Sequence, residues 1–139
     1  MIVFLLLLLG AVMNDTSARD VISINTGWQF KKGPFSTDPM RASAQWDGKW
    51  EEVTIPHTWN AKDMQVKADA FYEGVGYYRK KQFFGNELAG KRVFLRFEGV
   101  GACTEVYVNG KLVGTHKGGY SAFAFEIGTA LKLGAENEI

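Results

Sequence analysis

Hydrophobic side chains recur at every second position over much of the second half of the chain. Val93, Leu95 and Phe97 alternate with Phe94 and Arg96. A period of two places successive side chains on opposite faces of an extended backbone, whereas a helix repeats its apolar positions every three to four residues. The pattern therefore predicts a half-buried β-strand.

The pair Asn109-Gly110 predicts a tight turn between two further strands. A two-residue Asn-Gly loop readily takes the positive φ angles of a type I′ turn. We therefore predict that residues 104–108 and 111–116 form a β-hairpin. The Gly-Gly pair after it allows another sharp turn, and residues 122–125 resume an extended apolar run.

Short strands are predicted earlier at residues 21–24 and 51–55, and a strong strand at residues 76–84. Pro56 cannot donate to a ladder and is predicted to end the second of them. Residues 33–49 carry proline, glycine and serine without a sustained period, which predicts a long loop.

The strand predicted at residues 76–84 has no cleanly apolar face. We predict that Tyr78 and Phe84 point into the core while Arg79 and Lys81 stay exposed. Strands separated by turn signals along most of the chain predict an all-β sandwich.

Four short segments occur in a defined order: residues 27–30 (GWQF), 55–60 (IPHTWN), 74–80 (GVGYYRK) and 106–127 (VYVNGKLVGTHKGGYSAFAFEI). Together they resemble the N-terminal β-sandwich domain of glycoside hydrolase family two, which contains β-galactosidases, β-glucuronidases and β-mannosidases. An ordered match of four segments is far more specific than any one of them. The resemblance covers about residues 21–139 and implies a galactose-binding-like jelly-roll sandwich.

The resemblance also implies a function. The chain looks like the non-catalytic N-terminal domain of a secreted, exo-acting glycoside hydrolase, β-galactosidase-like, that removes a terminal β-linked sugar. Retaining glycosidases use two carboxyl groups about 5 Å apart, and the family's pair lies on a barrel domain that this chain does not reach. Glu51 and Glu52 are adjacent on a strand, so they point to opposite faces and form no such pair. We predict no catalytic residue and no cofactor here, and the rest of the hydrolase as the partner.

The loop at residues 57–72 has the composition of a carbohydrate site. Such sites combine a flat aromatic face with groups that hydrogen-bond hydroxyls. The candidate substrate-binding residues are Trp59, Asn60, Asp63 and Tyr72. In the family, a loop of this domain can reach the mouth of the active site, which favours the same segment. The alternative is a solvated loop in which Trp59 is a structural plug.

Two other functions stay open. The chain could be a self-standing carbohydrate-binding module that uses Trp59, Tyr72 or Tyr120 as a platform. It could also be an assembly domain that contacts no sugar.

The first residues resemble a secretory leader. Residues 2–9 form an uninterrupted apolar run, too short for the roughly 20 residues that a membrane span needs. We predict a signal peptide at residues 1–18, a β-sandwich domain at residues 19–139, no membrane span, and a secreted or periplasmic protein. The alternatives are a wrong start codon or a buried strand.

The balance of charges excludes two classes of partner. The 16 basic and 15 acidic residues leave a net charge of +1, which argues against nucleic acid or an anionic membrane as the partner.

The cysteine and histidine content predicts neither a disulfide nor a metal site. Cys103 is the single cysteine, so the chain cannot form an internal disulfide, and we predict that its side chain is buried. His57 and His116 lack carboxylates at ligand spacing, which predicts no metal site. We expect His116 to hydrogen-bond a neighbouring turn.

The last residues, 136–139, look like the start of another strand of the family's sandwich. We therefore expect that the sandwich lacks its last strand or strands, and that the chain is a fragment of a longer protein.

Overall fold

The computed structural model describes residues 19–33, 49–60 and 72–139. Within them the chain forms β-strands and two single-turn 3-10 helices, and no α-helix. This confirms the all-β prediction. The elements are β1 (Trp28–Gly33), β2 (Glu51–Val53), β3 (Val75–Arg79), β4 (Lys81–Phe84), η1 (Asn86–Leu88), β5 (Phe94–Phe97), β6 (Cys103–Val108), β7 (Lys111–Lys117), β8 (Phe123–Glu126), η2 (Gly128–Ala130) and β9 (Ala135–Glu138).

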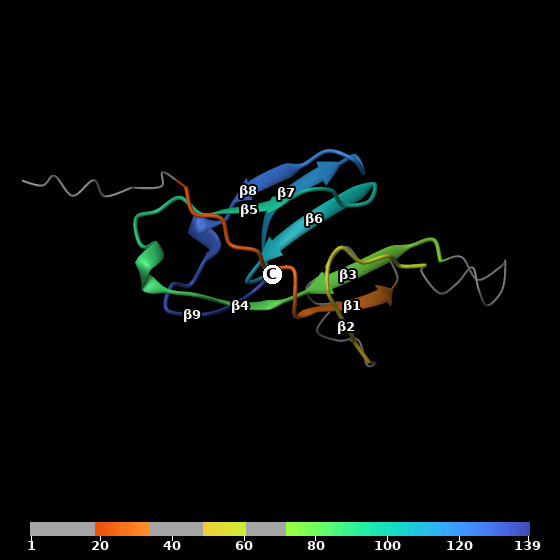
Figure 1. Cartoon of the computed structure of the whole chain (residues 1–139), viewed down its shortest axis with the longest axis horizontal. Helices are drawn as coiled ribbons and strands as arrows, with labels where there is room; N and C mark the ends of the chain where they lie inside the picture. Colours follow the sequence, from red (N-terminus) through yellow and green to blue (C-terminus); the bar gives the residue numbers. More distant parts are fainter. Residues whose placement is uncertain (1–18, 34–48, 61–71) are drawn as a thin grey trace, which may run out of the picture.

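The strands lie in two layers, as Figure 1 shows. One layer contains a sheet in the order β2-β1-β3 together with the antiparallel pair β4-β9. The other contains the antiparallel pairs β5-β8 and β6-β7. The arrangement is a β-sandwich, in which each layer covers one apolar face of the other.

The single strand predicted at residues 76–84 is divided between two partners. Its first part, β3, pairs with β1, and its second part, β4, pairs with β9. Lys80 separates them and exchanges two backbone hydrogen bonds of 2.9 Å with Ile139. Tyr78 and Phe84 pack against the core, as predicted.

The predicted hairpin is confirmed. Strands β6 and β7 are antiparallel, and Val108 pairs with Lys111 across the turn. Asn109 has φ 50° and Gly110 has φ 82°, the positive values that a type I′ turn requires at both positions. A bulge that the sequence did not reveal follows, because the register shifts between Val106 and Tyr107.

Two apolar clusters form the core. The larger contains Leu95, Val106, Val108 and Ile127, and the smaller contains Trp28, Phe30 and Val53. Ile24 and Ile139 pack against both clusters, so the two are joined into one interior. Burying each such large side chain contributes about 1.5–3 kcal/mol.

Two expectations were wrong. Residues 21–24 form no strand, and Val21 and Ile22 are each 78% exposed, because no neighbouring strand pairs with them. The strand begins only at Trp28. Cys103 is exposed because Val106 and Val108 face inward, which turns the odd-numbered positions of β6 outward. The predicted leader and residues 34–48 of the predicted loop lie outside the described residues.

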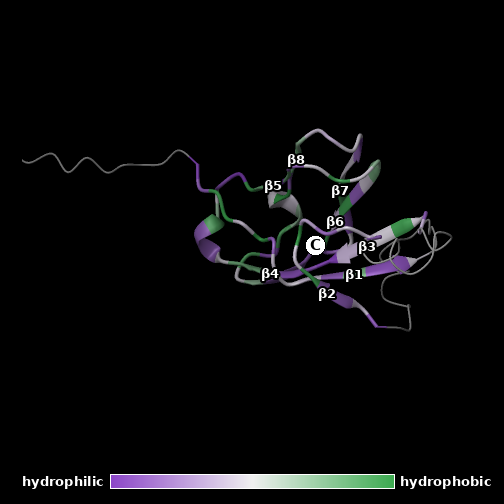
Figure 2. Cartoon of the chain, turned by 45° about the vertical axis from the view of Figure 1, so that its right-hand side comes forward, coloured by the Kyte–Doolittle hydropathy of each residue, from purple (hydrophilic) through white to green (hydrophobic). Residues whose placement is uncertain are grey.

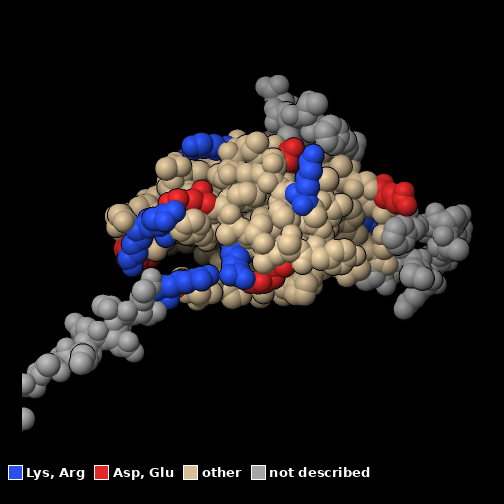
Figure 3. Space-filling view, turned by 90° about the horizontal axis from the view of Figure 1, so that it is seen from above, with Lys and Arg blue, Asp and Glu red and all other residues tan. Residues whose placement is uncertain are grey.

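The surface is mixed in polarity. Figure 2 shows hydrophobic and hydrophilic segments along the same strands, as expected where one face of a sheet is buried. On the face shown in Figure 3, basic and acidic side chains are interspersed around a broad uncharged area. Among the described residues, no helix has the length and apolar character to cross a membrane.

Candidate functional site

The structure brings three of the four candidate residues together. Trp59 and Tyr72 lie with ring centroids 6.1 Å apart, and Asn60 contacts Tyr72 directly. The fourth candidate, Asp63, lies outside the described residues. The cluster formed by Phe30, His57, Trp59, Tyr72 and Tyr78 is called the Trp59 cluster below.

The Asn60 side chain forms a two-bonded clamp on Tyr72. Its Nδ2 donates to the Tyr72 carbonyl oxygen at 3.1 Å, and the Tyr72 backbone N–H donates to its Oδ1 at 3.1 Å. The amide thus pairs with the backbone as a neighbouring strand would. Its function in this structure is to join two positions that are separated by 12 residues.

The Tyr72 hydroxyl is held by backbone groups of β1 and β3. It lies 3.0 Å from the carbonyl oxygens of both Gly33 and Val75, which share its single proton, and it accepts from the Val75 N–H at 3.1 Å. Gly74 makes room for it, since a Cβ there would lie 2.5 Å from the hydroxyl oxygen. Tyr72 therefore connects the two strands through its side chain.

Trp59 packs closely against the backbone of β3 at Gly76. A Cβ at Gly76 would lie 2.5 Å from Cζ2 of the indole, so only glycine admits the ring at this distance. The Trp59 Nε1 donates to the Tyr78 hydroxyl at 2.9 Å. The indole also packs against the smaller core cluster through Phe30, with ring centroids 6.2 Å apart.

Tyr78 and His57 complete the cluster. The Tyr78 hydroxyl lies 2.9 Å from His57 Nδ1, and its centroid is 4.8 Å from that of Phe30. Because the indole N–H of Trp59 can only donate, the Tyr78 hydroxyl accepts from it. The proton of that hydroxyl is then available for a bond to His57. The direction of the bond between the Tyr78 hydroxyl and His57 Nδ1 depends on the tautomer of the imidazole. Burial raises the pKa of the Tyr78 hydroxyl above its usual value, and the bond from Trp59 lowers it in part.

These contacts make the Trp59 cluster a hydrogen-bonded aromatic support. The hydrogen-bonding groups of Trp59 and Asn60 bind partners inside the chain, as the structural-plug alternative requires. Direct contact of Trp59, Asn60, Asp63 or Tyr72 with a sugar stays a prediction.

Five residues of the site were not identified from the sequence: Phe30, His57, Gly74, Gly76 and Tyr78. His57 and Tyr78 are residue types found in sugar sites, but composition alone did not place them beside Trp59, and the other three carry no polar side-chain group. A signal was present, however. Gly74 and Gly76, with one residue between them at the start of a strand, indicate that other groups approach the backbone of that strand closely.

Other candidates lie apart from this cluster. Tyr120 is fully exposed, and His116 contacts the Ser121 hydroxyl at 3.2 Å, as predicted for a turn partner. Arg79 stacks on Trp50, with its guanidinium carbon 4.0 Å from the ring centroid. Among the described residues, no group of three or more histidine, cysteine or acidic side chains could hold a metal ion.

Comparison with known families gives one match over most of the chain. The family described as "Glycosyl hydrolases family 2, sugar binding domain" matches residues 21–139. Among curated proteins, a β-glucuronidase of Bacteroides fragilis is 38% identical over 136 residues, covering 98% of this chain and 18% of its own. A β-galactosidase of Thermoanaerobacter pseudethanolicus is 33% identical, covering 84% of this chain and 15% of its own.

Solved structures agree with these matches. A Bacteroides fragilis protein described as a proposed β-galactosidase is 81% identical, with a TM-score of 0.73, covering 84% of this chain and 17% of its own. A Bacteroides uniformis β-glucuronidase is 36% identical, with a TM-score of 0.71, covering 84% of this chain and 14% of its own. The chain therefore spans less than a fifth of the length of each of these four relatives.

Proposed function

Since the chain belongs to the sugar-binding domain of glycosyl hydrolase family 2, we propose that it is the N-terminal, non-catalytic domain of a β-galactosidase-like hydrolase. The observation that carries the proposal is the family match over residues 21–139, combined with relatives that are several times longer. The 81% identity to the solved Bacteroides fragilis protein favours a galactoside as the substrate.

The hydrolysis itself would take place on another domain of that enzyme. Retaining hydrolysis of a terminal β-linked sugar uses two carboxyl groups about 5 Å apart. We therefore assign neither a catalytic residue nor a cofactor to this chain. Its partner is the rest of the hydrolase, and its role is to pack on the catalytic barrel and shape the rim of the sugar site.

Within that role, the Trp59 cluster would hold the rim in place. Its hydrogen bonds join the His57 and Trp59 side chains to Tyr78 of β3 and the Asn60 side chain to Tyr72, and a binding site is more precise when its supporting residues are fixed. Contact with the sugar would then come from the predicted set of Trp59, Asn60, Asp63 and Tyr72.

The proposal includes the finer features implied by the resemblance. The sandwich would have jelly-roll topology, residues 1–18 would be a signal peptide, and the hydrolase would act outside the cytoplasm or in the periplasm. Mass determination of the secreted protein's N-terminus tests the leader directly, since a mature chain that still begins at Met1 would contradict it.

The main test is hydrolysis by the full-length protein that contains this chain. We expect release of nitrophenol from p-nitrophenyl β-galactoside to exceed release from the matching β-glucuronide. The 139-residue chain alone should release none. A preference for the glucuronide would contradict the substrate, and activity on neither would contradict the hydrolase assignment.

The sugar contact has a separate test in the same full-length protein. Asp63→Ala should raise KM for the galactoside with little change in stability, whereas the control Asp20→Ala, at an exposed position, should leave KM unchanged. Equal KM values for both variants would exclude a contact by Asp63. Titration of the isolated chain with galactose, followed by tryptophan fluorescence, tests the alternative of an independent binding module.

A further inference from the structure

The hairpin turn contains the most labile asparagine of the sequence. Asn109 is the one asparagine that is followed by glycine. In such a pair the backbone nitrogen of the glycine can attack the asparagine side chain, because no Cβ hinders its approach and the backbone turns freely. Asparagine is among the thermolabile residue types.

The chemistry is a deamidation that needs only water. The Gly110 nitrogen would form a bond to Cγ of Asn109, the bond from Cγ to Nδ2 would break, and ammonia would leave with the displaced proton. Water then opens the five-membered imide at either carbonyl. The products are aspartate or an isoaspartyl linkage at position 109, with no change in oxidation state.

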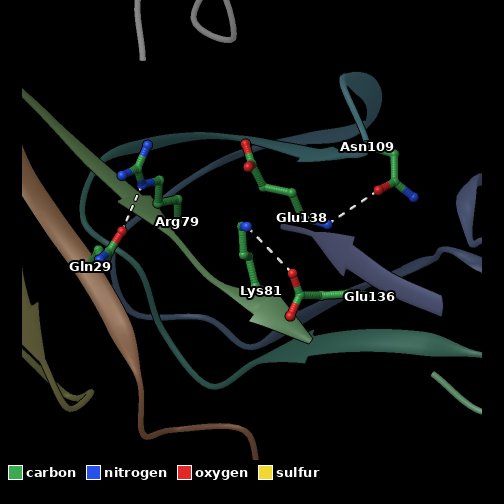
Figure 4. Close-up of polar contacts among 6 residues, drawn as sticks. All are labelled: Gln29, Arg79, Lys81, Asn109, Glu136 and Glu138. Carbon is green, nitrogen blue, oxygen red and sulfur yellow. Dashed lines mark hydrogen bonds and ion pairs between the residues drawn. The ribbon is translucent and has the colours of Figure 1, made fainter. Parts of the chain in front are cut away.

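The folded structure holds the Asn109 amide away from this reaction. Its Nδ2 donates to Ala130 O at 2.9 Å and to Asn137 Oδ1 at 2.7 Å, and its Oδ1 accepts from the Glu138 N–H at 3.1 Å. Figure 4 shows the last of these bonds, with the Asn109 side chain directed at β9. Rotation of the side chain away from this position would break these three bonds.

The partner of this amide is itself fixed. Asn137 is 1% exposed, its Oδ1 also accepts from Lys132 N at 2.7 Å, and its Nδ2 donates to Lys132 O and Ala135 O at 2.9 Å each. A rotation that exchanged its oxygen and nitrogen would break these bonds. Asn137 therefore presents an acceptor to position 109 and cannot present a donor.

Aspartate at position 109 does not fit this environment. An oxygen in place of Nδ2 would lie near Ala130 O and Asn137 Oδ1, so three acceptors would face one another without a proton between them. A carboxylate would also place a charge beside the buried Asn137. The isoaspartyl product lengthens the backbone within a two-residue turn, which the register of β6 and β7 does not allow.

From this geometry we propose that Asn109 is a deamidation site that the folded domain protects, and that its conversion in the unfolded chain prevents return to the native fold. Each time the chain unfolds, Asn109 can be converted and that molecule then fails to refold. Higher local stability at the β6–β7 turn therefore lengthens the lifetime of the folded protein. The proposal is independent of the hydrolase function.

The experiment measures deamidation of the full chain at mildly alkaline pH, with and without denaturing urea. Trypsin releases the peptide of residues 97–111, in which Asn109 is the only asparagine, and mass spectrometry quantifies its conversion. We expect conversion to be at least about ten-fold slower in the folded chain. Each of the three hydrogen bonds lowers the population of the state with a free Asn109 side chain by roughly two- to ten-fold. A synthetic peptide of the same residues, with and without urea, corrects for the effect of urea itself. Equal rates after this correction would overturn the proposal.

Two variants test the mechanism. Asn137→Ala should speed conversion in native buffer by about ten-fold, while Glu136→Ala, at the exposed neighbouring position, should not change it. Asn109→Asp should refold less completely than Asn109→Gly, because both remove the amide but only the first adds an acceptor. Refolding of Asn109→Asp to the wild-type level would contradict the second half of the proposal, even if Asn137→Ala does not fold.

Discussion

Gly114 in β7 is the residue at which an added methyl group meets the core most directly. A Cβ there would lie 2.3 Å from Cδ1 and Cε1 of the Phe125 ring and 2.6 Å from Cζ. Favourable contacts between carbon atoms are about 3.5–4.0 Å long. Gly114→Ala therefore requires the ring or the strand to move by about 1 Å.

Neither can move freely. Phe125 packs against the larger core cluster and against the ring of Phe123, with centroids 5.4 Å apart. Gly114 pairs with Val106 directly beside the bulge, which fixes the strand on its other side. Overpacking of this kind costs about 1–3 kcal/mol, a large share of the roughly 5–15 kcal/mol that stabilises a domain.

Urea unfolding of the full chain, followed by circular dichroism, measures the effect. Gly128→Ala is the matched control, because its Cβ would have no atom within 4 Å and its φ is not positive. We expect Gly114→Ala to lose about 1–3 kcal/mol, and Gly128→Ala to be neutral or to gain about 0.4–1 kcal/mol.

A double-mutant cycle then identifies the cause. If the ring is the obstacle, Gly114→Ala should cost less when Phe125 is replaced by leucine, with a favourable coupling of about 1 kcal/mol. Equal midpoints for Gly114→Ala and Gly128→Ala, or a cycle without coupling, would refute the steric argument.

Three further predictions use urea unfolding or its pH dependence. Asn137→Ala should lose about 1–3 kcal/mol because it removes a buried amide and leaves its part-buried backbone partners unpaired, while Glu136→Ala, in an exposed ion pair, should change stability by less than about 1 kcal/mol; equal losses would contradict this. Tyr78→Phe should lose about 1–3 kcal/mol and alter tryptophan fluorescence, since the Trp59 N–H loses its acceptor; wild-type values would show that the bond contributes nothing. The raised pKa of Tyr78 adds stability that is fully present below its usual pKa of 10.0 and is lost as pH rises through the folded value, because the unfolded chain releases the proton first. Stability measured from pH 9 to 12 should therefore fall more steeply in the wild type than in Tyr78→Phe, and parallel curves would contradict the assignment.

The strands could be predicted where their signals are local. The alternation around Leu95 and the Asn109-Gly110 turn depend on neighbouring residues alone, and both predictions were confirmed. The division of the long strand at Lys80 could not be predicted, because it depends on pairing with Ile139, which is distant in sequence. Likewise, the apolar run at residues 21–24 indicated burial but not the absence of a pairing strand.

The site was predicted in part for the same reason. Composition located Trp59, Asn60 and Tyr72, which the structure brings together, because aromatic and amide residues in one loop are visible in the sequence. Their hydrogen-bond partners were not visible, since Tyr78 and Gly33 come from other strands. A residue type shows which bonds a side chain can form, whereas the fold decides whether those bonds remain available to a ligand.

The beginning of β3 shows how the cluster is nevertheless encoded locally. Gly74, Gly76 and Tyr78 follow one another at every second position, so they share one face of the extended chain. The two glycines leave room for Tyr72 and Trp59, and the third residue supplies the hydroxyl that accepts from the indole. A Gly-x-Gly-x-Tyr segment at the start of a strand thus provides space for two aromatic side chains and one hydroxyl that accepts a hydrogen bond. Since a Cβ at either glycine would overlap an aromatic ring system, the spacing of this segment, rather than any single residue, positions the Trp59 cluster.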